Sequence, residues 1–335
     1  EQKLGARVML EYGVRFSMFN EIGPGSIYSY DQDGEIISEK AYPKGDIIST
    51  YIVPEPRFSM SYLLNEESSL KASYQNNAQY IHLLSASTSD NPTDVWVPSS
   101  SLIKPEKANQ YSVGYFRNFI DNTFETSIEV YYKDMSNLVD YKDGANVLLN
   151  EHVEADLVFG IGRSYGIELL LKKRLGAFTG WIGYTLSKTE NKFDAINNGD
   201  WFSARQDRTH DVSVVGMYDI NERISVSATW LYYTGDAVTM PSGQYLIDGN
   251  IVPLFTERNG YRMPDYHRLD LGLTLKGKET SKFKSSWNFS VYNAYARENA
   301  YSISFRESES NPGTMESVQF SLFSIVPSVT WNFIF

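Results

Sequence analysis

The sequence predicts an all-β protein, specifically a transmembrane antiparallel up-and-down β-barrel. Apolar and polar residues alternate with period two, and the connections between the alternating segments are alternately short and long. Aromatic residues make up 14% of the chain, yet mean hydropathy is negative and no unbroken apolar run approaches the roughly 18 residues of a spanning helix. An aromatic girdle around a wet interior accounts for this composition, whereas a helical membrane protein does not.

Alternation is clearest near residues 266–276. One face would carry Leu269, Leu271, Leu273 and Leu275, and the other Asp270, Gly272, Thr274 and Lys276. The final strand sets Val329, Trp331, Phe333 and Phe335 against Ser328, Thr330 and Asn332. A helix would scatter these sets around its axis.

About twelve segments show this pattern, near residues 5–19, 51–63, 68–87, 108–118, 124–139, 163–174, 178–189, 208–218, 224–234, 266–276, 283–294 and 319–335. Short links carrying Asn, Asp or Gly are expected near Asn65, Asp121, Gly176, Asn221 and Gly277. Long links are expected near residues 20–50, 88–107, 140–162, 190–207, 235–265 and 295–318.

This sorting of links predicts the topology. In an outer-membrane barrel the short turns are periplasmic and the long loops are outside, and counting back from Phe335 puts the end of the chain on the short-turn side. Several segments exceed the roughly 9–11 residues of a spanning strand. Residues 68–87 would form a strand of nearly twenty, which indicates a large barrel with walls beyond the membrane or a strand merged with an ordered loop.

Composition also excludes some functions. The chain has no Cys, so disulfides, thiolate metal sites and cysteine nucleophiles are ruled out. A net charge of -11 argues weakly against a nucleic-acid partner, because no basic cluster is present. Residues 1–10 lack a signal-peptide pattern and the chain does not begin with Met, so we expect a mature form or a piece of a longer protein.

Five segments carry a resemblance to a known family. These are EPRFSMSYLLNEESSLKASY (55–74), KPEKANQYSVGYFRNFIDNTFETSIEVYYKDMSNLVDY (104–141), GRSYGIELLLKKRLGAFTGWIGYTLSKTE (162–190), RNGYRMPDYHRLDLGLTL (258–275) and PSVTWNFIF (327–335). In this order they resemble phrases of TonB-dependent outer-membrane receptors of the Bacteroidetes type, in the C-terminal part of their barrel. The resemblance extends over nearly the whole chain.

The resemblance implies a barrel of about 22 strands, filled by an N-terminal plug and coupled to TonB. Residues 1–335 would hold about the last 12 strands, since we find neither a plug-like domain nor a TonB box. It further implies location in the outer membrane of a Gram-negative bacterium. The partners would be membrane lipid, TonB through the absent N-terminal part, the barrel-assembly machinery through Trp331, Phe333 and Phe335, and a surface lipoprotein or other envelope proteins.

Ligand contacts are expected in the long loops, where aromatic side chains mix with hydrogen-bonding groups. The candidates are Trp96, Trp201, Tyr245, Phe255, Tyr261 and Arg262. The same residues would also suit loop packing or contact with a neighbouring protein. Pro56 is expected to start an edge-like strand, with Arg57 pointing into the lumen.

Inward charges are expected at Glu125, Glu129, Lys133, Glu168, Lys172 and Asp270, where a solvated wall is the first interpretation and a translocation path the alternative. His82, His152, His210 and His267 are too far apart for a local metal motif. We expect no cofactor and no metal. We expect no enzyme.

Two functions remain open at this point. The first is an importer of a scarce nutrient (siderophore, oligosaccharide or peptide) driven through TonB. The second is a structural or scaffolding barrel that serves as a subunit of a larger outer-membrane assembly. A TonB box and plug in the complete reading frame would favour the first, and stable copurification with envelope proteins would favour the second.

Overall fold

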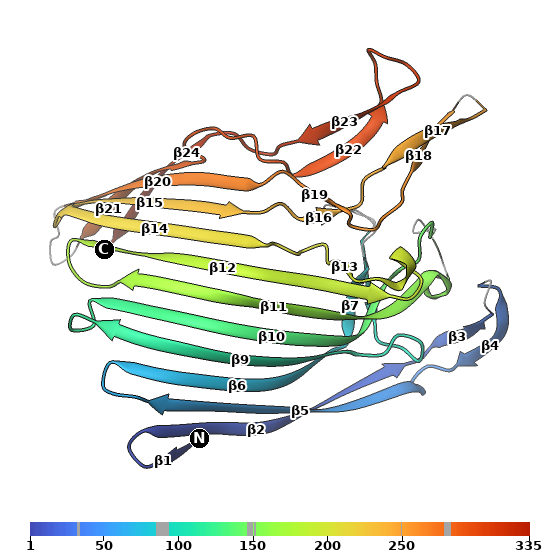
Figure 1. Ribbon diagram of the computed structural model, residues 1–335, viewed down its shortest axis with the longest axis horizontal. Helices are drawn as coiled ribbons and strands as arrows, with labels where there is room; N and C mark the ends of the chain where they lie inside the picture. Colours follow the sequence, from blue (N-terminus) through green and yellow to red (C-terminus); the bar gives the residue numbers. More distant parts are fainter. Residues whose placement is uncertain (32–33, 85–93, 146–149, 151, 249, 278–282) are drawn as a thin grey trace.

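The computed structural model describes residues 1–335 except 32–33, 85–93, 146–149, 151, 249 and 278–282. One curved antiparallel sheet runs through the chain (Figure 1). Its neighbouring strands, in order, are β1 (Gln2–Leu4), β2 (Val8–Ile22), β5 (Ile47–Leu63), β6 (Ser68–Gln79), β9 (Glu106–Phe119), β10 (Phe124–Tyr141), β11 (Leu157–Lys173), β12 (Phe178–Phe193), β14 (His210–Asn221), β15 (Ile224–Tyr233), β20 (Tyr266–Lys276), β21 (Lys284–Tyr292) and β24 (Val326–Ile334), while β13 (Phe202–Ser203) pairs with β12 at its end.

Each of the twelve long strands overlaps a segment predicted from alternation, and β1 adds a short strand before them. The short and long connections lie at opposite ends of the sheet, as the link lengths predicted (Figure 1). Residues 222–223 join β14 to β15, whereas residues 234–265 join β15 to β20. No helix among the described residues is long and apolar enough to cross a membrane.

Within the described ranges, five small two-stranded sheets occupy the long-loop end. They are β3 (Gly25–Tyr30) with β4 (Ile36–Tyr42), β7 (Ile81–Leu84) with β8 (Val95–Pro98), β16 (Ala237–Val238) with β19 (Tyr261–Arg262), β17 (Gly243–Ile247) with β18 (Asn250–Leu254), and β22 (Ser302–Glu307) with β23 (Met315–Phe320). The pairs β3–β4, β17–β18 and β22–β23 project beyond the large sheet in Figure 1.

Two predicted strands were too long. The segment 68–87 leaves the sheet after Gln79 and enters the β7–β8 hairpin, and residues 85–87 lie outside the described residues. The segment 319–335 begins in β23, leaves it after Phe320 and re-enters the large sheet at Val326. Both errors have one cause: a loop hairpin alternates with the same period as a wall strand, so alternation does not reveal which sheet a strand joins.

The strand register confirms the two-faced alternation. Leu273 pairs with Val226 and Phe289, which are all apolar. Thr274 pairs with Ser225 and Asn288, and the Asn288 amide donates to Thr274 Oγ1 over 3.0 Å. Because paired residues lie on the same side of a sheet, one face is apolar and the other polar across these strands.

An aromatic row crosses the apolar face. Successive residues of this row lie directly opposite one another on six neighbouring strands, namely Tyr12, Phe58, Tyr74, Tyr111, Tyr132 and Tyr165. On β10 a second aromatic level lies at Phe124, which pairs with Phe119. The eight residue steps from Phe124 to Tyr132 span ~27 Å of strand, or ~20 Å along the normal at a tilt of about 40°. That height is close to the ~25 Å apolar band of a membrane barrel.

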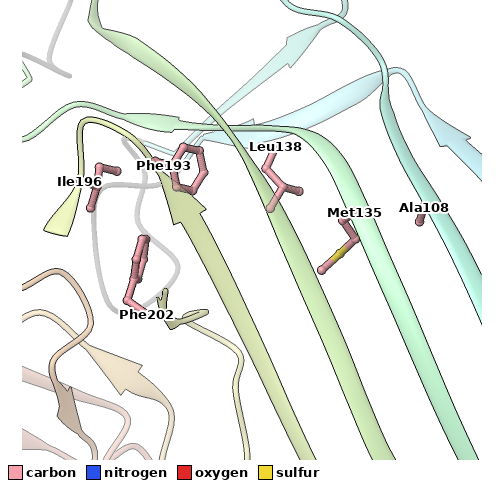
Figure 2. Packing of buried hydrophobic residues seen from close by; sticks show 6 residues of the cluster. All are labelled: Ala108, Met135, Leu138, Phe193, Ile196 and Phe202. Carbon is pink, nitrogen blue, oxygen red and sulfur yellow. The ribbon is translucent and has the colours of Figure 1, made fainter. Parts of the chain in front are cut away.

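Buried apolar residues gather on the polar face at the long-loop end (Figure 2). This cluster consists of Ala108, Met135, Leu138, Phe193, Ile196 and Phe202. Residues 194–202 reach it by folding over the ends of β10, β11 and β12, and β13 then pairs with β12. The cluster therefore anchors a long loop onto the inside of the wall.

The edges of the sheet are incompletely covered. β1 pairs with β2 only from Leu4↔Val8 to Gln2↔Leu10, so this side of β2 is covered over three residues. Beyond Leu10, β2 has no second partner strand within the described ranges, and neither has β24 on the side away from β21. The first and last wall strands do not pair with each other.

Pro56 lies in the interior of β5, so the expectation that it starts a strand was wrong. The edge character was right, because β6 pairs with β5 only from Arg57 onward and Pro56 has a partner strand on one side alone. Arg57 Nη2 donates to Asn77 Oδ1 over 3.3 Å, between β5 and β6.

Candidate ligand site

A cavity of about 690 Å³ lies at the long-loop end, where four connections meet. Its walls come from residues 140–145, from Arg205 of the β12–β14 connection, from residues 237–259 of the β15–β20 connection, and from β22. Tyr245 and Phe255 line it, joined by Tyr141 and Phe305. Two of the six candidate residues thus share one cavity, which has the size and aromatic lining of a small-molecule site.

Arg258 holds two of these loops together. Its guanidinium donates to Asp143 Oδ1 (2.7 Å), to Asp140 Oδ1 (3.2 Å) and to the carbonyl oxygen of Tyr141 (3.1 Å). The amide N–H of Arg258 donates to Asn197 Oδ1 over 2.8 Å, while the Asn197 amide donates to the carbonyl oxygen of Arg258 over 3.0 Å. This arrangement, here called the Arg258 latch, ties three connections that are far apart in sequence.

The charges that line the cavity balance. Three cations, Lys142, Arg205 and Arg258, meet three carboxylates, Asp140, Asp143 and Glu257. Lys142 also pairs with Asp156 at 2.7 Å. The cavity therefore offers aromatic faces and many hydrogen-bonding groups without an excess of either charge.

Two other candidates have structural partners elsewhere. Arg262 forms an ion pair with Asp207, whose side chain is fully buried. Trp201 covers the guanidinium of Arg163, whose carbon lies 4.2 Å from the ring centroid. Both belong to local packing between loops and wall, and neither lines the cavity.

The remaining candidates are exposed but separate from the cavity. Trp96 lies on the β7–β8 hairpin, opposite Leu83. Tyr261 lies on β19, opposite Val238. The six candidate residues do not form one site.

A second loop cluster joins the β3–β4 hairpin to residues 152–156. The rings of Tyr28 and His152 meet edge to face at 4.8 Å, and Ser100 donates to Glu154 Oε1 over 3.1 Å. Burial, opposed by this hydrogen bond, raises the pKa of the Glu154 carboxyl above its usual range. Burial lowers the pKa of His82, whose Nε2 lies 3.0 Å from Ser99 Oγ in the neighbouring hairpin.

The four histidines lie in four different environments. His210 Nδ1 contacts the Tyr184 hydroxyl at 2.9 Å, and His267 Nδ1 contacts the Tyr295 hydroxyl at 2.7 Å. Within the described ranges, no three His, Asp or Glu side chains come together as a group that could hold a metal ion.

The polar face carries the expected wall charges. Glu125 pairs in register with Lys172, and Glu129 pairs with Glu168. Glu129 and Lys71 line a cavity of about 380 Å³ along the strands, with serines from β5, β6 and β9. The Asp270 carboxylate accepts hydrogen bonds from Arg268 Nε (3.0 Å) and from the backbone N–H of Asn293 (2.9 Å). Such groups are typical of a solvated barrel interior.

At the other end of the chain, the C-terminal aromatic residues stack along the apolar face. Trp331 stacks on Trp287 at 5.7 Å, Phe333 contacts Trp331 at 4.5 Å, and Phe335 stacks on Phe333 at 6.0 Å.

A curved antiparallel sheet with one apolar face, one polar face and a loop-lined cavity at one end defines the wall of a transmembrane β-barrel. Residues 2–294 match the family described as TonB dependent receptor-like, beta-barrel. The chain belongs to this family of TonB-dependent receptors. The match does not identify a Bacteroidetes type within it. A comparison with curated proteins gives no match.

Solved structures share the fold. The siderophore receptor PiuA from Acinetobacter baumannii aligns with a TM-score of 0.60 at 12% identity, over 98% of this chain and 41% of that one. The closed form of the ferric-catecholate import receptor Fiu from E. coli K12 gives 0.57 at 17% identity, over 98% and 42%. The ferripyoverdine receptor of Pseudomonas aeruginosa gives 0.55 at 16% identity, over 88% and 33%. This chain spans less than half the length of each of them.

Proposed function

We propose that this chain forms part of the barrel wall of a Gram-negative outer-membrane receptor, which imports a scarce nutrient with energy delivered through TonB. The observation that carries the proposal is the loop-lined cavity at the mouth of a wall belonging to the TonB-dependent receptor family. The plug and the TonB box would belong to a part of the receptor outside residues 1–335. The barrel-assembly machinery would recognise Trp331, Phe333 and Phe335 during insertion.

The cargo would be a siderophore, an oligosaccharide or a peptide. The similar structures include receptors named for ferric catecholate and ferripyoverdine, but at 12–17% identity they support the fold alone. The balanced charges and the aromatic walls around Tyr245 and Phe255 favour a neutral polar cargo over a strongly anionic chelate. We therefore favour an oligosaccharide or a peptide.

Growth of the producing bacterium tests this proposal. Deletion of the complete gene, and separately of tonB, should abolish growth on one class of limiting nutrient among ferric siderophores, oligosaccharides and peptides. Replacing Tyr245 and Phe255 with Ala should weaken uptake, while Phe320→Ala on the exposed β23 hairpin should not. Unchanged growth on all three classes would contradict an import function.

A scaffolding role is the second candidate. The β17–β18 hairpin exposes Leu246 and Ile247, whose relative exposures are 63% and 51%, at the tip of a projecting hairpin. Exposed apolar residues of this kind suit contact with a surface lipoprotein or another envelope protein. Stable copurification of such a protein, combined with unaffected uptake, would support this function over import.

A further inference from the structure

Several cations lie on the apolar face just beyond the aromatic row, toward the long loops. Lys188 stands opposite Tyr165 and continues the row onto β12. On the same face and two residues closer to the long loops, Arg163 lies opposite Glu190. Two residues closer again, Lys192 lies opposite Ile161. On β9, Lys107 lies on the same face and is in register with Lys192 across the intervening strands, because Ser136 pairs with both Lys107 and Ile161.

The centre of this group is a built arrangement rather than a scatter of surface charges. Glu190, whose side chain is only 9% exposed, accepts from Arg163 Nε at 2.8 Å and Nη2 at 2.7 Å. The other oxygen of Glu190 lies 3.0 Å from Lys188 Nζ. One carboxylate thus positions two cations, and Trp201 covers the guanidinium of Arg163.

The group has an excess of positive charge. Four cations, Lys107, Arg163, Lys188 and Lys192, accompany two carboxylates, Asp134 and Glu190. The whole chain, by contrast, has a net charge of -11. The positive excess is therefore local to this part of the apolar face.

We propose that these cations bind a phosphate-bearing lipid headgroup of the leaflet on the long-loop side. On each strand of a barrel, an aromatic residue at the end of the apolar stretch lies near the depth at which the apolar band meets the headgroups, as Tyr165 does on β11. Cations directly beyond that level lie at the depth of lipid phosphates, which attract Lys and bind the guanidinium fork of Arg. Trp201 adds an aromatic ring of the type enriched at membrane interfaces.

This site rests on the membrane location in the proposed function and is independent of cargo and of TonB. The test is made in detergent, so that it does not depend on where the protein is found in the cell. The full protein expressed from its gene is titrated with bis-phosphorylated lipid A in mixed micelles, and binding is measured by native mass spectrometry. Lipid A without phosphate is the comparison probe.

The test variant carries Lys107→Gln, Lys188→Gln and Lys192→Gln. The matched control carries Lys71→Gln, Lys133→Gln and Lys172→Gln, which remove equal charge from the polar face. We expect the test variant to bind the phosphorylated lipid roughly tenfold or more weakly than the parent, and the control to bind like the parent. Added salt should weaken binding of the parent.

Folding of each variant is checked by heat-modifiable migration on gels. If the triple variant does not fold, the single Lys188→Gln variant replaces it, and a smaller loss of affinity for the phosphorylated lipid is expected. Equal affinities of the Lys188→Gln variant and the parent would overturn the proposal. Equal binding of phosphorylated and phosphate-free lipid by the parent would also overturn it.

Discussion

The ring of Phe193 on β12 occupies the space beside Gly160 on β11 where any other residue would place its Cβ. A Cβ built at Gly160 would lie 2.6 Å from Cδ1 of Phe193 and would also collide with the carbonyl oxygen of Lys192. Phe193 belongs to the buried cluster that anchors residues 194–202 onto the wall (Figure 2). The absence of a side chain at Gly160 is therefore a packing requirement of the loop anchor.

Replacing Gly160 with Ala should destabilise the folded protein by about 1–3 kcal/mol, because Phe193 and the β12 backbone must both move. Unfolding in urea, followed by tryptophan fluorescence in lipid vesicles, measures the change. Gly13→Ala is the control, since a Cβ there meets nothing within 4 Å. Equal stabilities of the two variants would show that the Phe193 contact is not tight.

The register predicts that arginine is tolerated differently on the two opposite faces of β20. Leu271 is on the apolar face and Thr274 on the polar face, so Leu271→Arg should cost about 2–4 kcal/mol in a bilayer. Thr274→Arg should cost much less, chiefly the hydrogen bond from Asn288. Equal tolerance of arginine at both positions in the same unfolding assay would refute the assigned faces.

The two ends of the sheet should differ in access from outside the cell. An epitope inserted near Gly243, at the start of an exposed hairpin, should be labelled by antibody on intact cells. An epitope near Asn221, beside a short turn, should be labelled only after the outer membrane is opened. The opposite pattern would invert the proposed topology.

The Arg258 latch should stiffen the cavity. Arg258→Ala removes the donors to Asp140 and Asp143, so amide hydrogen exchange in residues 140–145 and 253–259 should become at least severalfold faster. Arg306→Ala removes an exposed ion pair of the β22–β23 hairpin with Glu316 and should leave exchange in those residues unchanged. The latch would have no stiffening role if both variants exchanged like the parent.

Alternation predicted the wall strands well because a strand with one lipid-facing side must keep period two along its length. Pairs such as Thr274–Asn288 and Leu273–Phe289 then follow from the register. Alternation failed where β6 ends at Gln79, since the β7 residues beyond it alternate as well but pair with β8. Only the pairing partner distinguishes a wall strand from a loop hairpin, and a single sequence does not state the partner.

The candidate site was less predictable for a related reason. Tyr245 and Phe255 were found because they are aromatic residues in a long loop, but Trp201 shares that description and instead packs against Arg163. Arg262, a candidate from the same long loop as Tyr245, instead forms an ion pair with Asp207. Sequence reasoning missed Arg258, whose partners Asp140 and Asp143 lie more than a hundred residues away. Residue type alone carries no signal for contacts formed across separate loops.

We expect residues 1–335 to form part of a larger barrel wall, because the sheet that they form has two open edges. β2 beyond Leu10 and the outer side of β24 have no partner strand within the described part of the chain. In a bilayer each unsatisfied backbone group costs several kcal/mol, so an open sheet does not persist there. Both edges are therefore expected to pair with strands outside this chain.

Expression of residues 1–335 alone, targeted to outer membranes, tests this most directly. Heat-modifiable migration on gels and protease resistance would both be measured, with the complete gene product as the control. We expect the complete product to form a heat-modifiable, protease-resistant barrel, and residues 1–335 alone to be degraded or to aggregate. A heat-modifiable, protease-resistant barrel formed in good yield from residues 1–335 alone would show that these strands suffice and would contradict the account.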